Sequence, residues 1–591
     1  MHISNRKDAV GIGSLIIATL LVSPTQGSYI HETRRVANIT WSPCPDSNDT
    51  QCAFYEVPMD YTNSGDGETV SIFMRKLSAS VPSDQRLGSI LVNPGGPGGS
   101  GTQWIAEAGE MMSTMIEGRY DLIGFDPRGV NLTGPSTACL DSESKFLARE
   151  YRLRILGAPI PHLGGTAERA HVGEIVALQT GQGAACAQNG NHNMLRSVGT
   201  VAVAKDMARI VEALGEDGLN YWGYSYGTVL GSTFAALFPD LVNRMVLDGV
   251  SNAESYFNDV LQWGRDGMQD GSKVLTGFLS TCAEAGPEYC AFAVPRVGSK
   301  RETTESLRER LNSLFAKLSN APLTVPDSAA GSGIIKASDL QLAFLGTFYT
   351  PVVWSDFAQA LAQLEQGNGV SLYTMLYSPY SKIIPKPYNQ NIFNRSMQEV
   401  DTKESLFPIL CGDSSPLNVT VDAYMDYIRE LGKISPVGEQ WALIGGGCFS
   451  WPFRARERYT GPWTVEKGLK KTKFPILFIS GDADPVTPLA SGVKMSSGFG
   501  NQSATLLIQH GYGHCSSANP SLCTAKNVRD YFLDGKVPPN GTQCTSEPGY
   551  IYPTNATNTT SKRSLNKREQ GLIAAMDKMR TIRAKLMPFG F

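Results

Sequence analysis

A serine flanked by small residues lies where one segment of the chain changes character. In "NYWGYSYGTVLG" (220–231), Ser225 stands between Gly223 and Gly227, after an apolar run that favours a strand and before residues that favour a helix. A sharp strand-to-helix turn needs small residues on both sides of the serine, because larger side chains would collide with the neighbouring backbone. The same letters also fit an ordinary Gly/Ser loop. Their place between a strand and a helix favours a nucleophilic serine.

A serine nucleophile needs a base, and the chain has only seven histidines. Five of them precede Ser225: His2, His31, His162, His171 and His192. For a serine on this kind of turn the chain order is serine, acid, histidine, which leaves His510 and His514. We expect His514, in the compact loop of "HGYGHC", to be the base. His510 ends the preceding apolar run and is expected to pack or hydrogen-bond.

The carboxylate that orients the base should follow the preceding strand. The segment "ISGDADPVTP" offers Asp482 and Asp484 directly after the apolar run 474–479. Asp484 lies further out on the loop, before Pro485, and is our predicted acid. Asp482 is expected to close the turn as a local hydrogen-bond acceptor. Three polar turns in the order Ser, Asp, His, each ending an apolar strand, predict acyl-transfer chemistry.

Acyl transfer also needs donors for the developing oxyanion. One is predicted to be the backbone N–H of Tyr226, and the other that of Gly96 in the glycine-rich "LVNPGGPGGSG" (91–101). That loop has no G-x-x-x-x-G-K-[ST] pattern and no lysine after its glycines, which argues against a phosphate loop. No CxxC pair or His/Cys cluster has zinc spacing, so we predict neither a metal nor a cofactor.

Short apolar runs in two blocks predict the strands that position these residues. They are 69–77, 88–96, 120–129, 219–225 and 244–250, then 474–485 and 504–515. A helical pattern at 200–218, stopped by Gly215, gives a strand, helix, strand order. We therefore predict an α/β fold with a mostly parallel, doubly wound sheet, formed by 28–250 and 474–545. The helical insertion 251–473, with helices at 305–318 and 356–367, would be a lid.

Composition and the N-terminus point to secretion. Basic and acidic residues nearly balance, 52 against 55, so no basic field indicates nucleic acid or an anionic membrane. Residues 1–27 carry Arg6 and Lys7 before the mostly apolar run 9–22, followed by small residues near Gly27. This pattern is typical of a cleaved signal peptide, the alternative being an uncleaved anchor. No later segment is long and apolar enough to predict a membrane span.

Two further counts agree with a secreted glycoprotein. Asn-X-Ser/Thr acceptors are Asn38, Asn48, Asn131, Asn394, Asn418, Asn501, Asn540, Asn555 and Asn558. The 11 cysteines would mostly pair in an oxidising compartment. Predicted pairs are Cys44–Cys52, Cys139–Cys186, Cys282–Cys290, Cys411–Cys448 and Cys515–Cys523, leaving Cys544 single.

The tail 553–591 has a different composition. It is polar, with basic pairs at 562–563 and 567–568, and is expected to be disordered or a processing region. Its last part, 572–586, could form a short basic amphipathic helix. We expect a solvated appendage, and a membrane-surface or partner helix is the alternative.

These segments together resemble the secreted tripeptidyl aminopeptidase-like branch of the α/β-hydrolases, relatives of the proline iminopeptidases. The matching motifs are "FYEVPMDY", "ILVNPGGPGGSG", "DLIGFDPRGV", "YWGYSYGTVLG", "FPDLVNRMVLDGV", "FPILFISGDADPVTP" and "GYGHC". The resemblance implies an α/β-hydrolase fold, a Ser225, Asp484, His514 triad and a C-terminal module of the family from about Cys411. It also implies the removal of single residues or short peptides from free N-termini. Asp126 and Arg128 of "DPRG" would be a structural pair that fixes loops, with contact to the substrate as the alternative.

Such an exopeptidase would bind the substrate ammonium group with carboxylates of the lid. The candidates are Glu254, Asp259, Asp266, Glu399 and Asp401. Substrates would be peptides with a free N-terminus. A carboxylic-ester hydrolase could use the same triad, because the fold alone does not separate the two activities. A non-catalytic binding protein on this fold is the third hypothesis, disfavoured by the presence of all three triad residues.

Overall fold

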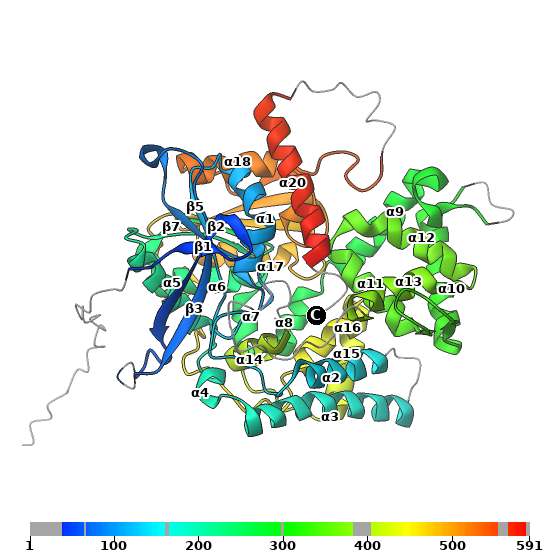
Figure 1. Ribbon diagram of the computed structural model, residues 1–591. Helices are drawn as coiled ribbons and strands as arrows, with labels where there is room; N and C mark the ends of the chain where they lie inside the picture. Colours follow the sequence, from blue (N-terminus) through cyan, green and yellow to red (C-terminus); the bar gives the residue numbers. More distant parts are fainter. Residues whose placement is uncertain are drawn as a thin grey trace, which may run out of the picture. The chain divides into compact units, whose positions relative to one another are not determined.

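A ten-stranded sheet forms the centre of the computed structural model, which describes residues 38–553 and 565–586 except 64, 66, 160–164, 297–300 and 382–402 (Figure 1). The predicted signal peptide therefore lies outside the described residues. The strand order is β1-β2-β3-β5-β4-β6-β7-β10-β11-β12. The strands are β1 (Ser42–Cys44), β2 (Ser47–Pro58), β3 (Thr69–Leu77), β4 (Ser89–Asn93), β5 (Asp121–Phe125), β6 (Leu219–Tyr224), β7 (Val242–Asp248), β10 (Ile476–Ala483), β11 (Ala504–Tyr512) and β12 (Thr542–Thr545).

The part of the sheet from β5 to β12 is parallel, and β1, β2 and β3 add to it in antiparallel fashion. Each of the seven predicted apolar runs overlaps one strand, so the prediction of a mostly parallel sheet is confirmed. Strands β1, β2 and β12 were not predicted. Because parallel strands end at one edge, the turns after β4, β6, β7, β10 and β11 converge there.

Both faces of the sheet are covered by helices. Successive side chains of a strand point to opposite faces, and in β4 the side chains on both faces are apolar. Leu91 of β4 belongs to the same hydrophobic core as residues of helices α5 (Thr200–Ala213), α6 (Tyr226–Leu237) and α17 (Leu489–Phe499). Its neighbours Ile90 and Val92 belong to a second core, with residues of α1 (Gly101–Met115), α18 (Leu522–Asp534) and α20 (Lys567–Leu586). This is the doubly wound arrangement expected for strands buried on both faces. The predicted helix stop is also confirmed, since α5 ends just before Gly215, whose φ is 70°.

Helices make up most of the described chain between β7 and β10, where the sequence predicted a helical insertion. They are α7 (Ala253–Asn258), α8 (Val260–Gly267), α9 (Gly271–Tyr289), α10 (Thr304–Asn320), α11 (Ala337–Tyr349), α12 (Trp354–Glu365), α13 (Val370–Ser381), α14 (Lys403–Asp413), α15 (Val421–Ile434) and α16 (Gly438–Gly446). A two-stranded sheet, β8 (Leu323–Val325) with β9 (Gly333–Ile335), lies among them. An earlier excursion, α2 (Glu143–Leu156), α3 (Gly165–Asn189) and α4 (His192–Leu195), was not predicted. It joins the same layer, because Glu168 of α3 pairs with Arg429 of α15 at 2.7 Å.

The cysteine prediction is right in four pairs and wrong in the fifth. Disulfides join Cys44–Cys52, Cys139–Cys186, Cys282–Cys290 and Cys411–Cys448, as predicted. The remaining disulfide is Cys523–Cys544, and the buried free cysteine is Cys515. Sequence proximity suggested Cys515 as the partner of Cys523. The fold overrides it, because α18 and β12 bring Cys523 and Cys544 together while Cys515 stays on the loop after β11.

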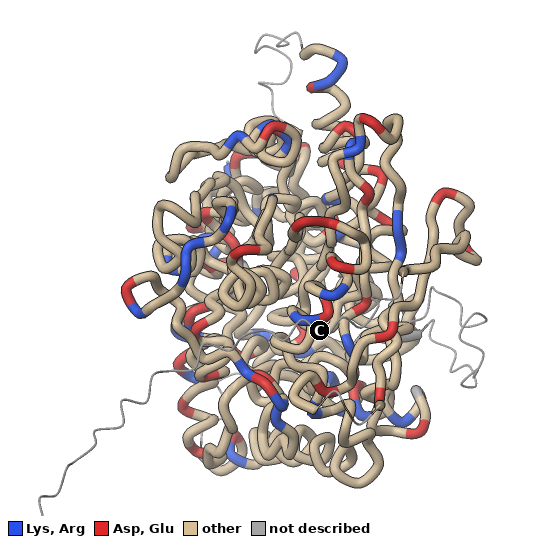
Figure 2. Tube along the Cα trace, turned by 90° about the vertical axis from the view of Figure 1, so that its left-hand side faces the viewer, with Lys and Arg blue, Asp and Glu red and all other residues tan. Residues whose placement is uncertain are grey.

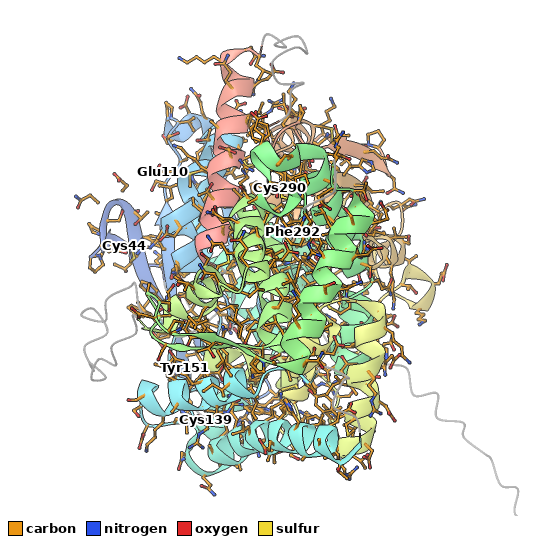
Figure 3. All side chains as sticks on the ribbon, turned by 90° about the vertical axis from the view of Figure 1, so that its right-hand side faces the viewer. Cys44, Glu110, Cys139, Tyr151, Cys290 and Phe292 are labelled. Atoms are coloured by element: carbon orange, nitrogen blue, oxygen red, sulfur yellow. A yellow bond between two sulfur atoms is a disulfide. The ribbon has the colours of Figure 1, made fainter. Side chains whose placement is uncertain are left out.

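The tail helix also differs from its prediction. We expected 572–586 to be a solvated appendage, but α20 lies alongside α1, on which Glu110 is labelled in Figure 3. Leu572, Met576 and Met579 are buried in the same core as α1 and α18. Their spacing makes one apolar stripe, which is why the helix packs instead of standing in water. Residues 554–564, with the first basic pair, lie outside the described residues.

Acidic and basic residues are interspersed along the chain, with neither sign gathered on one side in the view of Figure 2. This agrees with the near balance of 52 basic and 55 acidic residues. Among the helices that the structure describes, none combines the length and apolar character needed to cross a bilayer.

Candidate active site

Ser225 occupies the turn between β6 and α6 with φ 56° and ψ −124°, a left-handed conformation that is rare for a residue with a side chain. The flanking glycines make this turn possible. A Cβ on Gly223 would lie 2.5 Å from the Gly227 carbonyl oxygen, and one on Gly227 would lie 2.8 Å from that of Asn93. A Cβ on Gly231 would meet Leu247 at 2.5 Å. The predicted strained turn is therefore present, and its serine is half-buried at the edge where the parallel strands end.

The glycine-rich loop after β4 lies against this turn. A Cβ built on Gly95 would come within 2.8 Å of the Ser225 Cβ and 3.2 Å of the Tyr226 backbone nitrogen. Gly96 follows with φ 110°, and a Cβ there would collide with the next turn of the loop. The loop is held by Asn93, whose Oδ1 accepts the Gly95 N–H at 3.0 Å. The backbone thus approaches the serine from the side on which a second oxyanion donor is needed.

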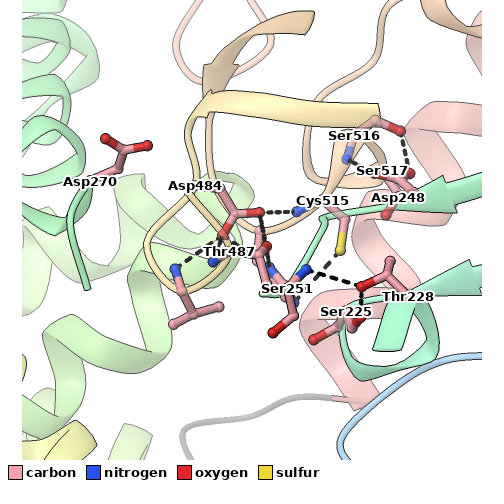
Figure 4. Close-up of polar contacts among 12 residues, drawn as sticks. Ser225, Thr228, Asp248, Ser251, Asp270, Asp484, Thr487, Cys515, Ser516 and Ser517 are labelled. Atoms are coloured by element: carbon pink, nitrogen blue, oxygen red, sulfur yellow. Dashed lines mark hydrogen bonds and ion pairs between the residues drawn. The ribbon is translucent and has the colours of Figure 1, made fainter. Parts of the chain in front are cut away.

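Asp484 is in direct contact with His514. Figure 4 shows Asp484 with Cys515 and Thr487 in the same region as Ser225. Both carboxylate oxygens lie 3.0 Å from His514 Nδ1. Four further donors hold the carboxylate: the N–H groups of Val486, Thr487 and Cys515, and the Thr487 hydroxyl. An acid held by so many donors has little freedom to rotate, so it fixes the imidazole plane through Nδ1 and directs Nε2 away from the carboxylate.

Burial and charge act in opposite directions on this pair. Burial disfavours the protonated ring, but the neighbouring Asp484 charge outweighs it and raises the pKa of His514 to about 9. Burial also disfavours the charged form of Asp484, which by itself would raise its pKa. His514 and the N–H donors outweigh burial and hold the pKa of Asp484 below its usual value. His514 is 1% exposed and Asp484 0%. The pair therefore favours an ionised acid beside a ring that binds a proton readily, as a general base requires.

Asp248, at the end of β7, connects the serine turn with the histidine turn. Its backbone carbonyl accepts the Ser225 N–H at 2.9 Å. Its carboxylate accepts the N–H of Ser516 at 2.8 Å and the Ser516 hydroxyl at 2.5 Å. Sequence reasoning missed this residue. The signal was present in "RMVLDGV", where an aspartate ends an apolar strand in the same way as the predicted acid does.

The Nε2 atom of His514, which would take the serine proton, lies 3.6 Å from Cys515 Sγ. Asp484, His514 and Cys515 thus place three potential metal ligands within 4.8 Å of one another. The hydrogen bonds already described account for the Asp484 and His514 contacts without an ion. We therefore read this group as part of the serine site.

Asp126 and Arg128 both fix loops, but they do not pair with each other as the resemblance implied. Arg128 forms a two-point ion pair with Asp206 at 2.7 and 2.8 Å, and both side chains are fully buried. Asp126 instead accepts from Ser100, Thr102 and Asn131, next to the glycine-rich loop. Burial raises the pKa of Asp126 to about 6 against these donors.

The predicted glycan at Asn131 conflicts with this geometry. Its Nδ2 atom, the atom that would carry the sugar, donates to Asp126 at 2.7 Å and lies near Ser100 and Thr102. The hydroxyl of Thr133, the third residue of the acceptor motif, donates to the Asp126 carbonyl at 2.7 Å and is buried. Asn131 is therefore used to hold a loop.

Three of the five carboxylates predicted to bind a substrate ammonium group already have partners. Glu254 pairs with Lys494 at 2.8 Å. Asp259 caps the N-terminus of α8. Asp266 accepts from Asn252 and Gln262. The other two, Glu399 and Asp401, lie outside the described residues.

The other histidine of the pair, His510, is also bound to an aspartate. Its Nδ1 lies 2.6 Å from Asp482 Oδ2, and its Nε2 lies 2.9 Å from Gln543 Oε1. The side chains of His510 and Asp482 are 40% and 35% exposed, and both line a groove of about 730 Å³ beside α9. The expectation that His510 hydrogen-bonds is confirmed. The expectation that Asp482 closes its own turn is wrong: its carboxylate accepts the N–H of Gly511 at 3.1 Å, on the neighbouring strand β11, because the fold brings the ends of β10 and β11 together.

Known proteins are similar in sequence to most of this chain. The model of the alpha/beta hydrolase fold family matches residues 88–285, and that of the TAP-like protein family matches 434–544. The tripeptidyl aminopeptidase of Streptomyces lividans is 35% identical over 516 residues, which cover 86% of this chain and 87% of the relative. The chain belongs to the tripeptidyl aminopeptidase-like family of α/β-hydrolases. It is a hydrolase of the serine peptidase type.

More distant members of the family carry different names. Serine protease Hip1 of Mycobacterium tuberculosis is 27% identical over 522 residues, covering 86% of this chain and 91% of the relative. A protein named carboxylesterase B from the same species is 26% identical over 503 residues, covering 84% and 86%. Peptidases and an esterase thus occur among the relatives of this aminopeptidase-like chain.

Proposed function

We propose that the protein is a secreted serine exopeptidase that cleaves peptides near their free N-termini. Ser225 attacks the peptide carbonyl, and His514 Nε2 takes the serine proton and returns it to the leaving amine. Asp484 holds the ring with Nδ1 toward its carboxylate. Water then releases the peptide from the acyl-enzyme by the same base. The observation that carries the proposal is the contact of His514 Nδ1 with both carboxylate oxygens of Asp484, each at 3.0 Å, together with the φ of 56° at Ser225.

The developing oxyanion is bound by the backbone N–H groups of Tyr226 and Gly96. Tyr226 begins α6, so its N–H points out of a helix N-terminus and adds the favourable end of the helix dipole. The close approach of Gly95 to Ser225 supports a donor from the neighbouring loop. One such donor contributes roughly 2.7–4 kcal/mol to transition-state stability.

The exopeptidase mode is supported by the 35% identical relative, which is named a tripeptidyl aminopeptidase. An exopeptidase must hold the ammonium group of its substrate with at least one carboxylate. Of the five predicted carboxylates, Glu254, Asp259 and Asp266 are engaged within the protein. Glu399 and Asp401 are therefore the first to test.

A panel of substrates tests this mode. Free and N-acetylated versions of the same peptide amides are compared with short-chain esters, using Ser225→Ala as the inactive control. We expect turnover of free peptides, with Glu399→Gln or Asp401→Asn raising their KM and leaving ester hydrolysis unchanged. Equal cleavage of free and acetylated peptides overturns the exopeptidase mode. Turnover of esters alone favours the second candidate, a carboxylic-ester hydrolase, which the carboxylesterase among the relatives supports.

Secretion is proposed from the N-terminal segment and the cysteines. Five disulfides among the described residues are typical of an oxidising compartment. Exposed acceptor residues are Asn38, Asn48, Asn418, Asn501 and Asn540, whereas Asn394, Asn555 and Asn558 lie outside the described residues. Mass spectrometry of the protein from culture medium is expected to find an N-terminus near residue 28 and glycans at these sites but not at Asn131. An intact N-terminus on a cell-bound protein would contradict secretion.

A further inference from the structure

The last turns of α20 reach the loop that carries the catalytic histidine. Leu572, Met576 and Met579 form the buried stripe of this helix. Arg583 is one helical turn beyond Met579 on the same stripe and is 1% exposed. A stripe that only packs would continue with an apolar residue, because a buried guanidinium costs several kcal/mol unless it is paired. The arginine therefore needs a partner in the core.

The partners of Arg583 belong to the active site. Its Nη1 donates to Ser517 Oγ at 2.5 Å, three residues after His514. Its guanidinium carbon lies 5.9 Å from the ring centres of Trp104 and Tyr224, and Tyr224 directly precedes the nucleophile. Figure 4 shows the faint red ribbon of α20 next to Ser517 and Asp248. One side chain of the tail thus lies against both turns of the site.

Charge supports the same arrangement. Asp248 is 1% exposed, and burial raises its pKa, while Ser516 and the Arg583 charge act in the opposite direction. For Arg583, burial opposes the charged form, but Cys515 and Asp248 outweigh it and raise the pKa. The Arg583 charge on the C-terminal helix therefore favours the ionised form of the aspartate that joins the Ser225 and Ser516 turns.

We propose that Arg583 is a positioning residue for the catalytic base, and that α20 is a required part of the active site. It acts through Ser517 and Asp248, which hold the 514–517 turn and so the ring of His514. Both family models end before α20, at residues 285 and 544, so this support comes from a segment outside them. The inference rests on the proposed triad but not on the exopeptidase mode.

The test compares Arg583→Met with Arg580→Met in the full mature chain. Arg580 lies on the same helix, but it pairs with Asp577 and donates to the Tyr550 carbonyl, whereas Arg583 donates to Ser517. Two readouts are used: kcat and KM on a cleaved substrate, and the rate at which a fluorophosphonate labels Ser225. Arg583→Met is expected to lower kcat and the labelling rate together by roughly 10- to 100-fold, since small misplacements of a catalytic group have effects of this size. KM should stay within about 3-fold.

Two milder variants keep the test valid if Arg583→Met folds poorly. Ser517→Ala removes only the hydroxyl that accepts from Arg583, and Arg583→Lys keeps the charge. Both variants should fold, and both should lower kcat less than Arg583→Met does. In both, the pH at which kcat/KM reaches half its maximum should differ from that of the wild type. Melting curves of every variant separate a loss of fold from a loss of rate.

Three results would overturn the proposal: wild-type kcat in both Arg583→Met and Ser517→Ala, equal losses in Arg583→Met and Arg580→Met, or a rate increase in Arg583→Met. The last would mean that the tail inhibits the enzyme. Failure of the triad itself gives a different result, because Ser225→Ala would then keep its turnover. An inactive Ser225→Ala with an unaffected Arg583→Met rejects this inference alone.

Discussion

Two histidine–aspartate pairs lie where β10 and β11 end: Asp482 and His510 are in the last residues of the strands, and Asp484 and His514 are in the loops that follow. His510 and Asp482 are 2.6 Å apart, closer than His514 and Asp484 at 3.0 Å. In both pairs the residue after the histidine donates its N–H to the aspartate: Gly511 in one, Cys515 in the other. The pairs differ in burial, 40% and 35% exposed against 1% and 0%. A short histidine–aspartate contact therefore does not identify a catalytic base.

What separates the pairs is the environment of the second ring nitrogen. In the exposed pair, Nε2 of His510 is engaged by the Gln543 side chain. In the buried pair, Nε2 of His514 faces Cys515, and the following residue Ser516 binds the aspartate whose carbonyl holds Ser225. Water weakens the interaction of exposed charges, whereas the buried pair keeps its full strength. The buried pair is thus suited to catalysis and the exposed pair to local structure.

Exchange of each histidine for glutamine should give the largest contrast. His514→Gln removes the proposed base and is expected to lower kcat by at least about 10⁴-fold. His510→Gln should leave kcat within about 3-fold, because its nitrogens face Asp482 and Gln543 and not the serine. Steady-state kinetics on one substrate measure both. Comparable losses in the two variants would mean that burial does not separate the pairs.

Exchange of the aspartates should give the next largest contrast. Asp484→Asn keeps the shape but removes the charge that stabilises the protonated ring, and we expect kcat to fall roughly 10³- to 10⁴-fold. Asp482→Asn should change kcat by less than about 3-fold. Circular dichroism is used to check that both variants fold. A large loss in Asp482→Asn would assign a catalytic role to the exposed pair.

The dependence on pH sharpens the comparison further. His514 must be neutral to accept the serine proton, and Asp484 raises its pKa, so kcat/KM should rise with pH on the acidic side of the profile by about tenfold per unit. The pKa of His510 is also raised, by its hydrogen bond to Asp482. The hydrogen bond of protonated His510 to Asp482 therefore stabilises the folded protein below about pH 6.5. This stabilisation is lost as the pH rises through the pKa of His510 in the folded state.

His510→Gln should therefore alter the melting temperature at acidic pH and leave the kcat/KM profile in place. Both quantities are measured on the same samples from pH 5 to 10. A shift of the kcat/KM profile in His510→Gln would contradict the separation of the two pairs.

The sequence predicted the sheet and the positions of the candidate triad because both depend on local patterns. Apolar strands that end in polar turns reveal themselves residue by residue, as at "GDADP" and "GYGHC". The Cys523–Cys544 pairing and the burial of Arg583 depend on how distant segments meet, and no local pattern carries that information. Asp248 was missed for a related reason. Its position looked like an ordinary strand end until the fold placed it between Ser225 and Ser516.

The residue after each histidine gives the smallest expected effect. Cys515 takes φ 63°, a conformation that favours glycine, whereas the matching position of the exposed pair is Gly511. Its thiol contacts Nε2 at 3.6 Å, a weak interaction for sulfur. Cys515→Ala should therefore keep kcat within about 3-fold and lower the free energy of unfolding by about 1 kcal/mol through lost packing. The check is kcat together with denaturant unfolding. A loss of kcat comparable to that of Asp484→Asn would place the thiol in the proton-transfer chemistry, and burial alone would then no longer separate the proposed catalytic pair from the exposed one.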